Sequence, residues 1–256
     1  RHDVDVCVIG GGIGGMFTAI SAARHGAKVA LMQDRPVLGG NASSEIRMWV
    51  CGANGENNRE GGIIEELFLE NFYHNPSLHY PLWDMQLYEK ARAEENITLL
   101  LNTSCLDATM DGNRIVSIKA WQSNAETFHT VEAKYFADCS GDSILAPLTG
   151  ANYMYGREAK NEFGETIPPD TADKKTMGMS CLFQIRETDH KVDFVPPKWA
   201  YKYESDDDLP YKDHHKNSNF WWIELGGEWD CIHDTDRCRD ELLKICYGVW
   251  DHMKNH

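Results

Sequence analysis

The sequence lacks the short patterns that mark common metal centres, membrane spans and leaders. None of its eight cysteines forms a Cys-x-x-Cys pair, and no His-Glu-x-x-His motif occurs among its eleven histidines. Spacing therefore predicts no zinc ribbon, thioredoxin motif or iron–sulfur cluster, and we expect no metal site. No apolar run is long enough to cross a bilayer, and no basic stretch followed by an apolar core marks a signal peptide.

Positive charge is also scarce. The chain carries 25 basic and 40 acidic side chains, a net charge of -15. Nucleic-acid binding depends on clusters of Lys and Arg, so we expect no nucleic-acid partner. The acidic triplet at 206–208 is interpreted as a solvated loop, with a cation site as the alternative. Scattered cysteines favour free thiols and a cytoplasmic location, and a periplasmic or secreted one stays open if a leader was removed.

What the chain does have is a β-α-β pattern in its first 33 residues. Residues 4–10 form a short apolar run typical of a buried parallel strand. The following residues place apolar side chains on one helical face, and Gly26 is a natural helix stop. Residues 28–32 form a second buried strand. A unit of about 30 residues is the smallest that gives a parallel pair.

A glycine motif, Gly10-x-Gly12-x-x-Gly15, joins the first strand to the helix. The first glycine permits a tight turn, the second lets a pyrophosphate approach the backbone, and the third lets the helix pack close to the strand. The helix N-terminus then offers free N–H groups to phosphate. This setting predicts dinucleotide binding, and the alternative is a glycine-rich turn without a ligand.

The end of the second strand carries Gln33 where such units normally carry Asp or Glu for the ribose hydroxyls. Glutamine can donate and accept hydrogen bonds, so it can still hold a ribose diol. Asp34 is the alternative if the register shifts by one residue. Arg35 is near in the sequence, so recognition of a 2′-phosphate by this arginine stays an alternative.

We expect residues 1–150 to form one α/β domain with a Rossmann-like parallel sheet. A long Gly-, Asn- and Ser-rich loop at 39–62 leads into a helical insertion at about 59–95. Strand-like runs then predict an inserted antiparallel β-meander at about 97–133: 97–101, 105–110, 114–121 and 127–133. Residues 134–139 return to a buried strand.

Residues 151–256 predict the start of a mixed α+β substrate domain. Strand candidates lie at 178–186 and 219–225, and the last 20 residues form an amphipathic helix that begins near Thr235 or Asp236. The aromatic residues of this part, Phe220, Trp221, Trp222 and Trp229, could stack on a carbohydrate. The alternative is that they form the core of the second domain.

Three motifs give the sequence a family resemblance. They are Val8-Ile9-Gly10-Gly11-Gly12-Ile13-Gly14-Gly15, Leu38-Gly39-Gly40-Asn41-Ala42-Ser43 and Asp138-Cys139-Ser140-Gly141-Asp142. In this order, over residues 4–157, they resemble the FAD-dependent oxidoreductase family of glutathione-reductase-like flavoproteins with two dinucleotide-binding domains. They are also similar to the flavin subunit of heterodisulfide reductases.

The resemblance implies FAD as cofactor and a set of binding residues. It places the pyrophosphate, adenosine ribose, ribityl chain and adenine edge against Gly10, Gly12, Gly15, Gln33, Asp34, Arg35, Gly39, Gly40, Asn41, Ser43, Cys105, Ser140, Gly141 and Asp142. Members of the superfamily close the flavin site with a late Gly-Asp segment and a final helix. We find no such segment after residue 160, so we expect the rest of the pocket to lie outside these residues.

The loop after Gly40 holds the candidates for catalysis. Oxidation of an alcohol or amine needs a base, and a positive group near the flavin stabilises its reduced form. Glu45 or Glu60 could be the base, Arg47 the positive group, and Cys51 a redox partner or covalent anchor. The alternatives are that these residues order the loop through salt bridges and that Cys51 is a structural thiol.

Together these patterns predict an oxidoreductase that passes electrons as hydride from a small organic substrate to FAD, with a carbohydrate or another hydroxylated molecule as candidate. The electron acceptor is unknown, and a homo-oligomer stays open. One alternative is an electron-transfer subunit or a protein with a structural flavin. The other is an NAD-binding Rossmann module.

Overall fold

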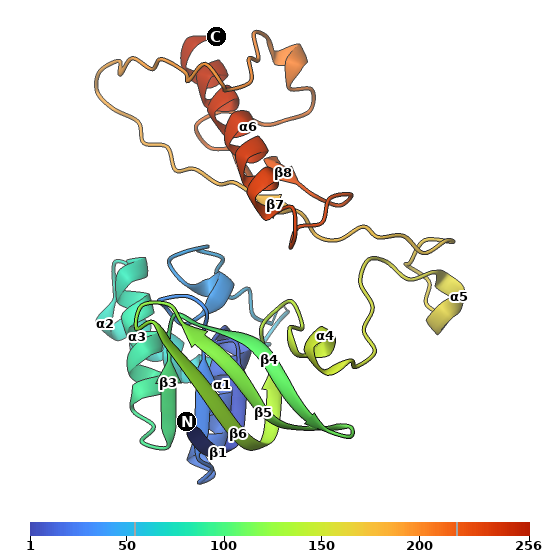
Figure 1. Cartoon of the computed structure of the whole chain (residues 1–256). Helices are drawn as coiled ribbons and strands as arrows, with labels where there is room; N and C mark the ends of the chain where they lie inside the picture. The colour runs from blue at the N-terminus through green and yellow to red at the C-terminus, as the bar shows by residue number, and fades with distance from the viewer. Residues whose placement is uncertain (54, 219) are drawn as a thin grey trace. The chain divides into compact units, whose positions relative to one another are not determined.

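The computed structural model describes residues 1–53, 55–218 and 220–256. Asn54, in the predicted functional loop, and Asn219, in a predicted strand, lie outside the described residues. The chain forms two compact units, Arg1–Tyr153 and Met154–His256. Each unit has core residues of its own and is described by itself below. Figure 1 shows the helices and strands of both units. The assignment of cofactor and substrate roles to the two parts of the chain stays a prediction.

The first unit is built on a six-stranded sheet with the order β3-β2-β1-β6-β5-β4. Its strands are β1 (His2–Ile9), β2 (Val29–Met32), β3 (Ile97–Leu100), β4 (Thr103–Asp111), β5 (Arg114–Gln122) and β6 (Thr127–Asp138). β3, β2, β1 and β6 run parallel to one another, whereas β5 pairs antiparallel with β6, and β4 pairs antiparallel with β5. This arrangement confirms the predicted Rossmann-like α/β class.

The predicted limits of the β-meander are wrong in two places. Residues 97–101 were expected in the meander, but β3 pairs in parallel with β2, with Ile97 opposite Val29. Residues 127–133 and 134–139 were expected as two strands, but β6 is one strand. Its first half pairs with β5 and its second half with β1. No glycine or proline interrupts β6, so nothing breaks the extended backbone.

Three helices cover one face of this sheet: α1 (Ile13–Arg24), α2 (Ile63–His74) and α3 (Tyr80–Arg92). Alternate strand residues therefore enter two separate cores. Val8 and Leu31 pack with the helices, whereas Cys7 and Ala30 pack on the opposite face with residues of the meander. Burial raises the pKa of the Cys7 thiol to about 12, as expected for a core residue.

The second unit packs around its last helix, α6 (Thr235–Asn255). The predicted apolar face of this helix is confirmed, because Leu242 and Val249 are buried in the core of the unit. The predicted strands shrink to a short antiparallel pair, β7 (Met179–Ser180) and β8 (Glu224–Leu225). Phe220 is buried in the same core and Trp222 packs against it, as the core alternative proposed. That alternative is wrong for Trp221, which is exposed, and Trp229 does not belong to this core cluster of described residues.

The described residues also form the short helices α4 (Leu145–Thr149) in the first unit and α5 (Lys160–Phe163) in the second, and the 3₁₀ turn η2 (Asp206–Asp208) in the second unit. Two further 3₁₀ turns are η1 (Gly40–Ala42) and η3 (Phe220–Trp222). Within the described part of the chain, we find no helix whose length and apolar content would let it span a membrane.

Candidate functional site: a glycine cradle and an adjoining aromatic cavity

The glycine motif between β1 and α1 is packed so tightly that two of its glycines have no room for a side chain. A Cβ on Gly10 would lie 2.2 Å from the carbonyl oxygen of Cys139, and one on Gly15 would lie 1.8 Å from the carbonyl oxygen of Gly10. Gly10 also has a φ of 102°, in the left-handed region. Gly12 is different, since the nearest atom to its Cβ position is the Gly40 Cα at 4.0 Å.

A second glycine loop lies beside this motif. The Gly39 N–H donates to the Gly11 carbonyl at 2.8 Å, and Gly12 and Gly39 form an isolated parallel bridge. A Cβ on Gly40 would be 3.1 Å from the Gly12 Cα. Two turns without side chains therefore lie against each other at the start of α1.

These features fit a dinucleotide pyrophosphate. Among the described residues, no side chain caps the N-terminus of α1 and its first turn holds no acidic residue. The first N–H groups of a helix need acceptors, and phosphate oxygens are suitable ones. Gly12 gives such a group open backbone to approach. The residues present thus suit the pyrophosphate of FAD, with Gly10 and Gly15 serving the fold of the cradle.

Gln33, at the end of β2, faces the glycine motif. Its side chain is buried, and its Oε1 accepts a hydrogen bond from the Gly11 N–H at 2.7 Å. The amide N–H groups of Gln33 can still donate to a ribose hydroxyl, and the second lone pair of Oε1 can still accept a hydrogen bond. Arg35 is ion-paired with Glu45 at 3.5 Å, and Asp34 is exposed. The ribose roles of Gln33, Asp34 and Arg35 stay predictions.

The third motif begins at the carboxyl end of β6. The Cys139 N–H donates to the Ile9 carbonyl at 2.7 Å, which places the motif beside the end of β1. Asp138 orders it: its carboxylate accepts from the Ser140 hydroxyl at 2.6 Å and from the Leu145 N–H at 2.8 Å. Gly141 follows with a φ of 86°. The roles of Ser140, Gly141 and Asp142 toward FAD stay predictions.

Cys105 lies close to the end of β2, although β4 and β2 are far apart in the sheet order. The link is Thr103, the first residue of β4, whose N–H donates to the Gln33 carbonyl at 2.8 Å. Burial raises the pKa of the Cys105 thiol to about 11, so this thiol is a poor nucleophile at neutral pH. The adenine contact expected from the backbone of Cys105 stays a prediction.

Three side chains of α3 hold the loop that follows Gly40. The Trp83 indole Nε1 donates to the Ala42 carbonyl at 2.9 Å, and Asp84 Oδ1 accepts from the Ser44 N–H at 2.8 Å. The Tyr80 hydroxyl donates to the Arg47 carbonyl at 2.8 Å. Helix α3 therefore fixes the path of this loop through its backbone, over three successive hydrogen bonds.

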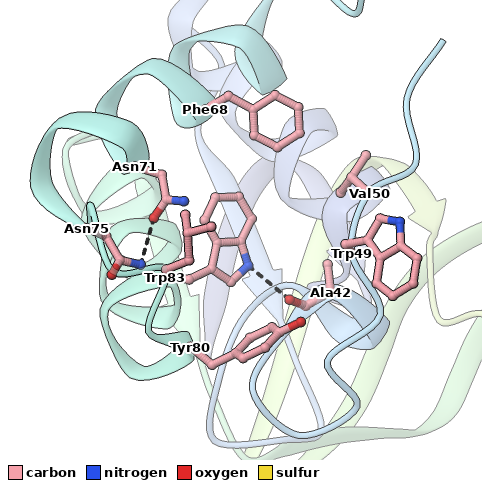
Figure 2. Close-up of a pocket in the computed structure, with 9 residues that line it drawn as sticks. Ala42, Trp49, Val50, Phe68, Asn71, Asn75, Tyr80 and Trp83 are labelled. Carbon is pink, nitrogen blue, oxygen red and sulfur yellow. Dashed lines mark hydrogen bonds between the residues drawn. The ribbon is translucent and has the colours of Figure 1, made fainter. Parts of the chain in front are cut away.

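Between α2, α3 and this loop lies a cavity of about 290 Å³ with mostly aromatic and aliphatic walls (Figure 2). It is lined by Ala42, Trp49, Val50, Phe68, Asn71, Asn75, Leu78, Tyr80 and Trp83. The amides of Asn71 and Asn75 supply its polar side and bond to each other at 2.9 Å. Apolar walls with a few fixed polar groups are typical of small-molecule sites.

Among the described residues, the contacts given for Glu45 and Arg47 lead to residues other than the remaining predicted catalytic groups. Glu45 forms an ion pair with Arg35, as the salt-bridge alternative proposed. The Arg47 guanidinium bonds to the Ser44 carbonyl at 3.1 Å and lies over the Tyr80 ring. Cys51 is an exposed free thiol. Their catalytic roles stay predictions.

The sequence reasoning missed Asp138 as an ordering residue and the whole set on α3. Asp138 begins the third motif, and its carboxylate at a strand end was the available signal. The segment 80–84 reads Tyr-Pro-Leu-Trp-Asp, where Pro81 marks a helix start. Nothing in that pattern shows which loop Trp83 and Asp84 would contact.

Comparison with known proteins gives short or distant likenesses. A 43-residue stretch is 45% identical to the soluble pyridine nucleotide transhydrogenase of Marinobacter nauticus and covers 17% of this chain and 9% of that protein. THI4 of Thermovibrio ammonificans is 17% identical over 66% of this chain and 76% of its own, with a TM-score of 0.43. An FAD complex of glycerol-3-phosphate dehydrogenase from Bacillus halodurans is 14% identical over 57% and 36%, with a TM-score of 0.38.

The chain thus spans only a small part of the length of that transhydrogenase. A myxobacterial FAD-dependent halogenase is 16% identical over 55% of this chain and 38% of its own, with a TM-score of 0.39. The family match is much longer. The model of the family described as FAD dependent oxidoreductase matches residues 5–245, which includes the glycine cradle, the loop held by α3 and most of the second unit. The chain therefore belongs to the FAD dependent oxidoreductases, and its cofactor is FAD.

Proposed function

We propose that this protein oxidises a small hydroxylated organic molecule bound in the aromatic cavity. The observation that carries the proposal is the position of Ala42, which lines the cavity and ends the turn that begins at Gly40. The cavity therefore adjoins the second glycine loop of the cradle. When bound, FAD supplies a two-electron acceptor for hydride from a substrate carbon.

The walls of the cavity suit a ring-shaped or branched molecule with hydroxyl groups. Trp83 is held in place by its bond to Ala42, so its ring is a rigid wall. Asn71 Oδ1 accepts from Asn75 Nδ2 at 2.9 Å and from Gln86 Nε2 at 3.3 Å. The Asn71 amide N–H groups then remain to donate to a substrate oxygen. A carbohydrate is one member of this class.

Proton removal needs a group outside the cavity walls. The Tyr80 hydroxyl is committed to the Arg47 carbonyl, and the described residues lining the cavity include no carboxylate or imidazole. We keep Glu45, on the same loop, as the base that accepts the hydroxyl proton. Arg47 would then stabilise the negative charge of the reduced cofactor. Cys51 stays a candidate redox partner or covalent anchor of the flavin, and no step of the proposed oxidation depends on it.

The test is a substrate screen with the purified protein reconstituted with FAD. Sugars, polyols and hydroxy acids are added without air, and the loss of the oxidised-flavin absorbance is followed. Bleaching by a hydroxylated compound supports the proposal. Reduction by NADH or NADPH alone would instead support an electron-transfer subunit, and a bound flavin that none of these compounds reduces would support a structural flavin.

Two variants test whether the substrate binds in the cavity. Trp49→Ala removes a wall of the cavity, whereas Tyr73→Ala removes an exposed aromatic side chain of α2 that does not line it. We expect Trp49→Ala to raise the substrate concentration needed for half-maximal bleaching at least about tenfold, with FAD binding unchanged. Equal behaviour of the two variants would show that the substrate binds elsewhere. Glu45→Gln and Cys51→Ser, assayed in the same way, test the two remaining roles.

A further inference from the structure

In the second unit, three side chains from two separate segments meet at one point. Asp206 belongs to η2, His214 follows it on the same loop, and His252 lies in the last turn of α6. Asp206 Oδ1 is 3.3 Å from His214 Nε2 and 3.1 Å from His252 Nε2. One ligand atom from each residue lies within 4.8 Å of the other two. The His252 side chain is only 6% exposed, whereas that of Asp206 is 88% exposed.

The other nitrogen of each imidazole is bound to the backbone. His252 Nδ1 is 2.9 Å from the Tyr203 carbonyl oxygen, and His214 Nδ1 bonds to the carbonyl oxygen of Lys212. A carbonyl oxygen can only accept, so Nδ1 carries the proton in both rings. In a neutral imidazole, Nε2 then has a lone pair. Both Nε2 atoms therefore point their lone pairs at the carboxylate of Asp206.

Three groups that offer electron pairs to one another need a cation between them. Either protons convert the histidines to imidazolium, or a metal ion occupies the centre. In a tetrahedral zinc site with bonds of about 2.0–2.2 Å, neighbouring ligand atoms lie about 3.4 Å apart. The two distances from Asp206 Oδ1 are close to this value. Histidines that bind metals commonly donate their second ring N–H to a backbone carbonyl, as both do here.

The surroundings also favour a cation. The C-terminal end of a helix carries partial negative charge, and His252 lies in the last turn of α6. The turn that carries Asp206 is ordered by its own side chains, because Asp208 Oδ2 accepts from the N–H groups of Glu204 at 2.8 Å and Ser205 at 3.0 Å. The carboxylate of Asp206 is therefore presented by a turn whose backbone is already held in place.

We propose that Asp206, His214 and His252 form a binding site for a divalent transition-metal ion of the zinc class. Imidazole nitrogen and carboxylate oxygen are ligands that such ions accept, and the exposed side of Asp206 leaves room for water as a fourth ligand. The ion ties the loop 203–214 to the end of α6. The expectation of no metal site came from spacing, and 38 residues separate His214 from His252.

The test measures metal binding and thermal stability of the whole protein. Zn²⁺ is titrated by calorimetry into metal-free protein, and Co²⁺ is used as a spectroscopic probe of tetrahedral nitrogen and oxygen coordination. We expect one Zn²⁺ per chain to depend on this site, a rise in the melting temperature, and a visible Co²⁺ band. Removing an outer-sphere partner of a metal typically weakens binding about 10–100-fold, so loss of a direct ligand is expected to weaken it at least as much.

Matched variants make the result specific. Asp206→Asn and His214→Ala remove ligands, whereas Asp207→Asn and His215→Ala change the neighbouring residues of the same types. The His215 side chain is exposed and pairs with Asp213. All variants keep the eight cysteines, so metal bound by thiols is common to the set. If the ligand variants bind Zn²⁺ and Co²⁺ as the controls do, or if the wild type gains no stability from Zn²⁺, the cluster is a proton-bridged ion pair and the proposal is wrong.

Discussion

The indole N–H of Trp83 donates to the carbonyl oxygen of Ala42 at 2.9 Å, and this bond joins α3 to the turn that follows the second glycine loop. Both residues are buried and lie 41 positions apart in the sequence. The same two residues line the aromatic cavity. One hydrogen bond thus couples the wall of the proposed substrate site to the backbone beside the cradle.

Trp83→Phe tests this coupling. The ring wall is largely kept, but the Ala42 carbonyl loses its donor, and a buried polar group without a partner costs about 1–3 kcal/mol. We expect a loss of unfolding free energy in that range, measured by urea denaturation. Trp199→Phe serves as the control, because Trp199 is about half exposed and its replacement should change the stability little. Equal stabilities of the two variants would contradict the importance of the bond.

The glycine motif gives a pair of matched substitutions on one helix. A Cβ at Gly15 would overlap the Gly10 carbonyl oxygen, whereas nothing lies within 4 Å of the Cβ position of Gly14. Gly15→Ala is expected to lower the unfolding free energy by about 1–3 kcal/mol and to abolish retention of FAD on a desalting column. Gly14→Ala is expected to raise the unfolding free energy of the FAD-free protein by up to about 1 kcal/mol, because alanine has a higher helix propensity than glycine. A stable Gly15→Ala protein that keeps FAD would show that the packing of the motif is not required.

Gln33 provides a test of how the end of β2 supports the motif. Gln33→Met keeps the length of the side chain but removes the acceptor for the Gly11 N–H, and we expect a loss of about 1–3 kcal/mol in unfolding free energy. Gln33→Glu keeps an acceptor at the same place and is expected to stay close to the wild type in stability at pH 7. Denaturation of the three proteins in the presence and absence of FAD distinguishes support of the fold from contact with the ribose.

The acid stability of the first unit should depend on Glu66. Its carboxylate contacts Arg24 at 2.9 Å and Lys90 at 2.8 Å, and hydrogen bonds from these two side chains lower its pKa to about 2. A carboxyl with a lowered pKa in the folded state stabilises the fold above its unfolded pKa, near 4.5, and loses that effect as the pH falls toward 2. Because Glu66 is partly exposed, we expect only about 1 kcal/mol.

Glu66→Gln checks this pH dependence. The variant should be less stable than the wild type at pH 7, and the difference should shrink as the pH is lowered from about 5 to about 2. Melting temperatures across this range give the readout. Glu70→Gln is a useful comparison, since the ion pair described for Glu70 is with Lys90 and not with Arg24. A difference that stays constant with pH would mean that Glu66 does not act through its charge.

The sequence alone determined the local parts of this protein. The apolar run of β1, the glycine motif and the helix after it are contiguous in the chain, so their spacing dictates a β-α-β unit and a phosphate-binding turn. The amphipathic face of α6 was predicted for the same reason, because 3.6-residue periodicity is visible within one segment.

Only the tertiary structure decided the contacts between distant segments. The sequence of the four residues of β3 allows parallel or antiparallel pairing, and in the structure β3 pairs in parallel with β2. Packing brings Trp83 into contact with Ala42, 41 positions away in the sequence. It also places His214 beside His252, 38 positions away. Periodicity indicates which face of an element is buried, but it does not indicate which other element packs against that face. Both the cavity and the His–Asp cluster are formed by contacts between distant elements.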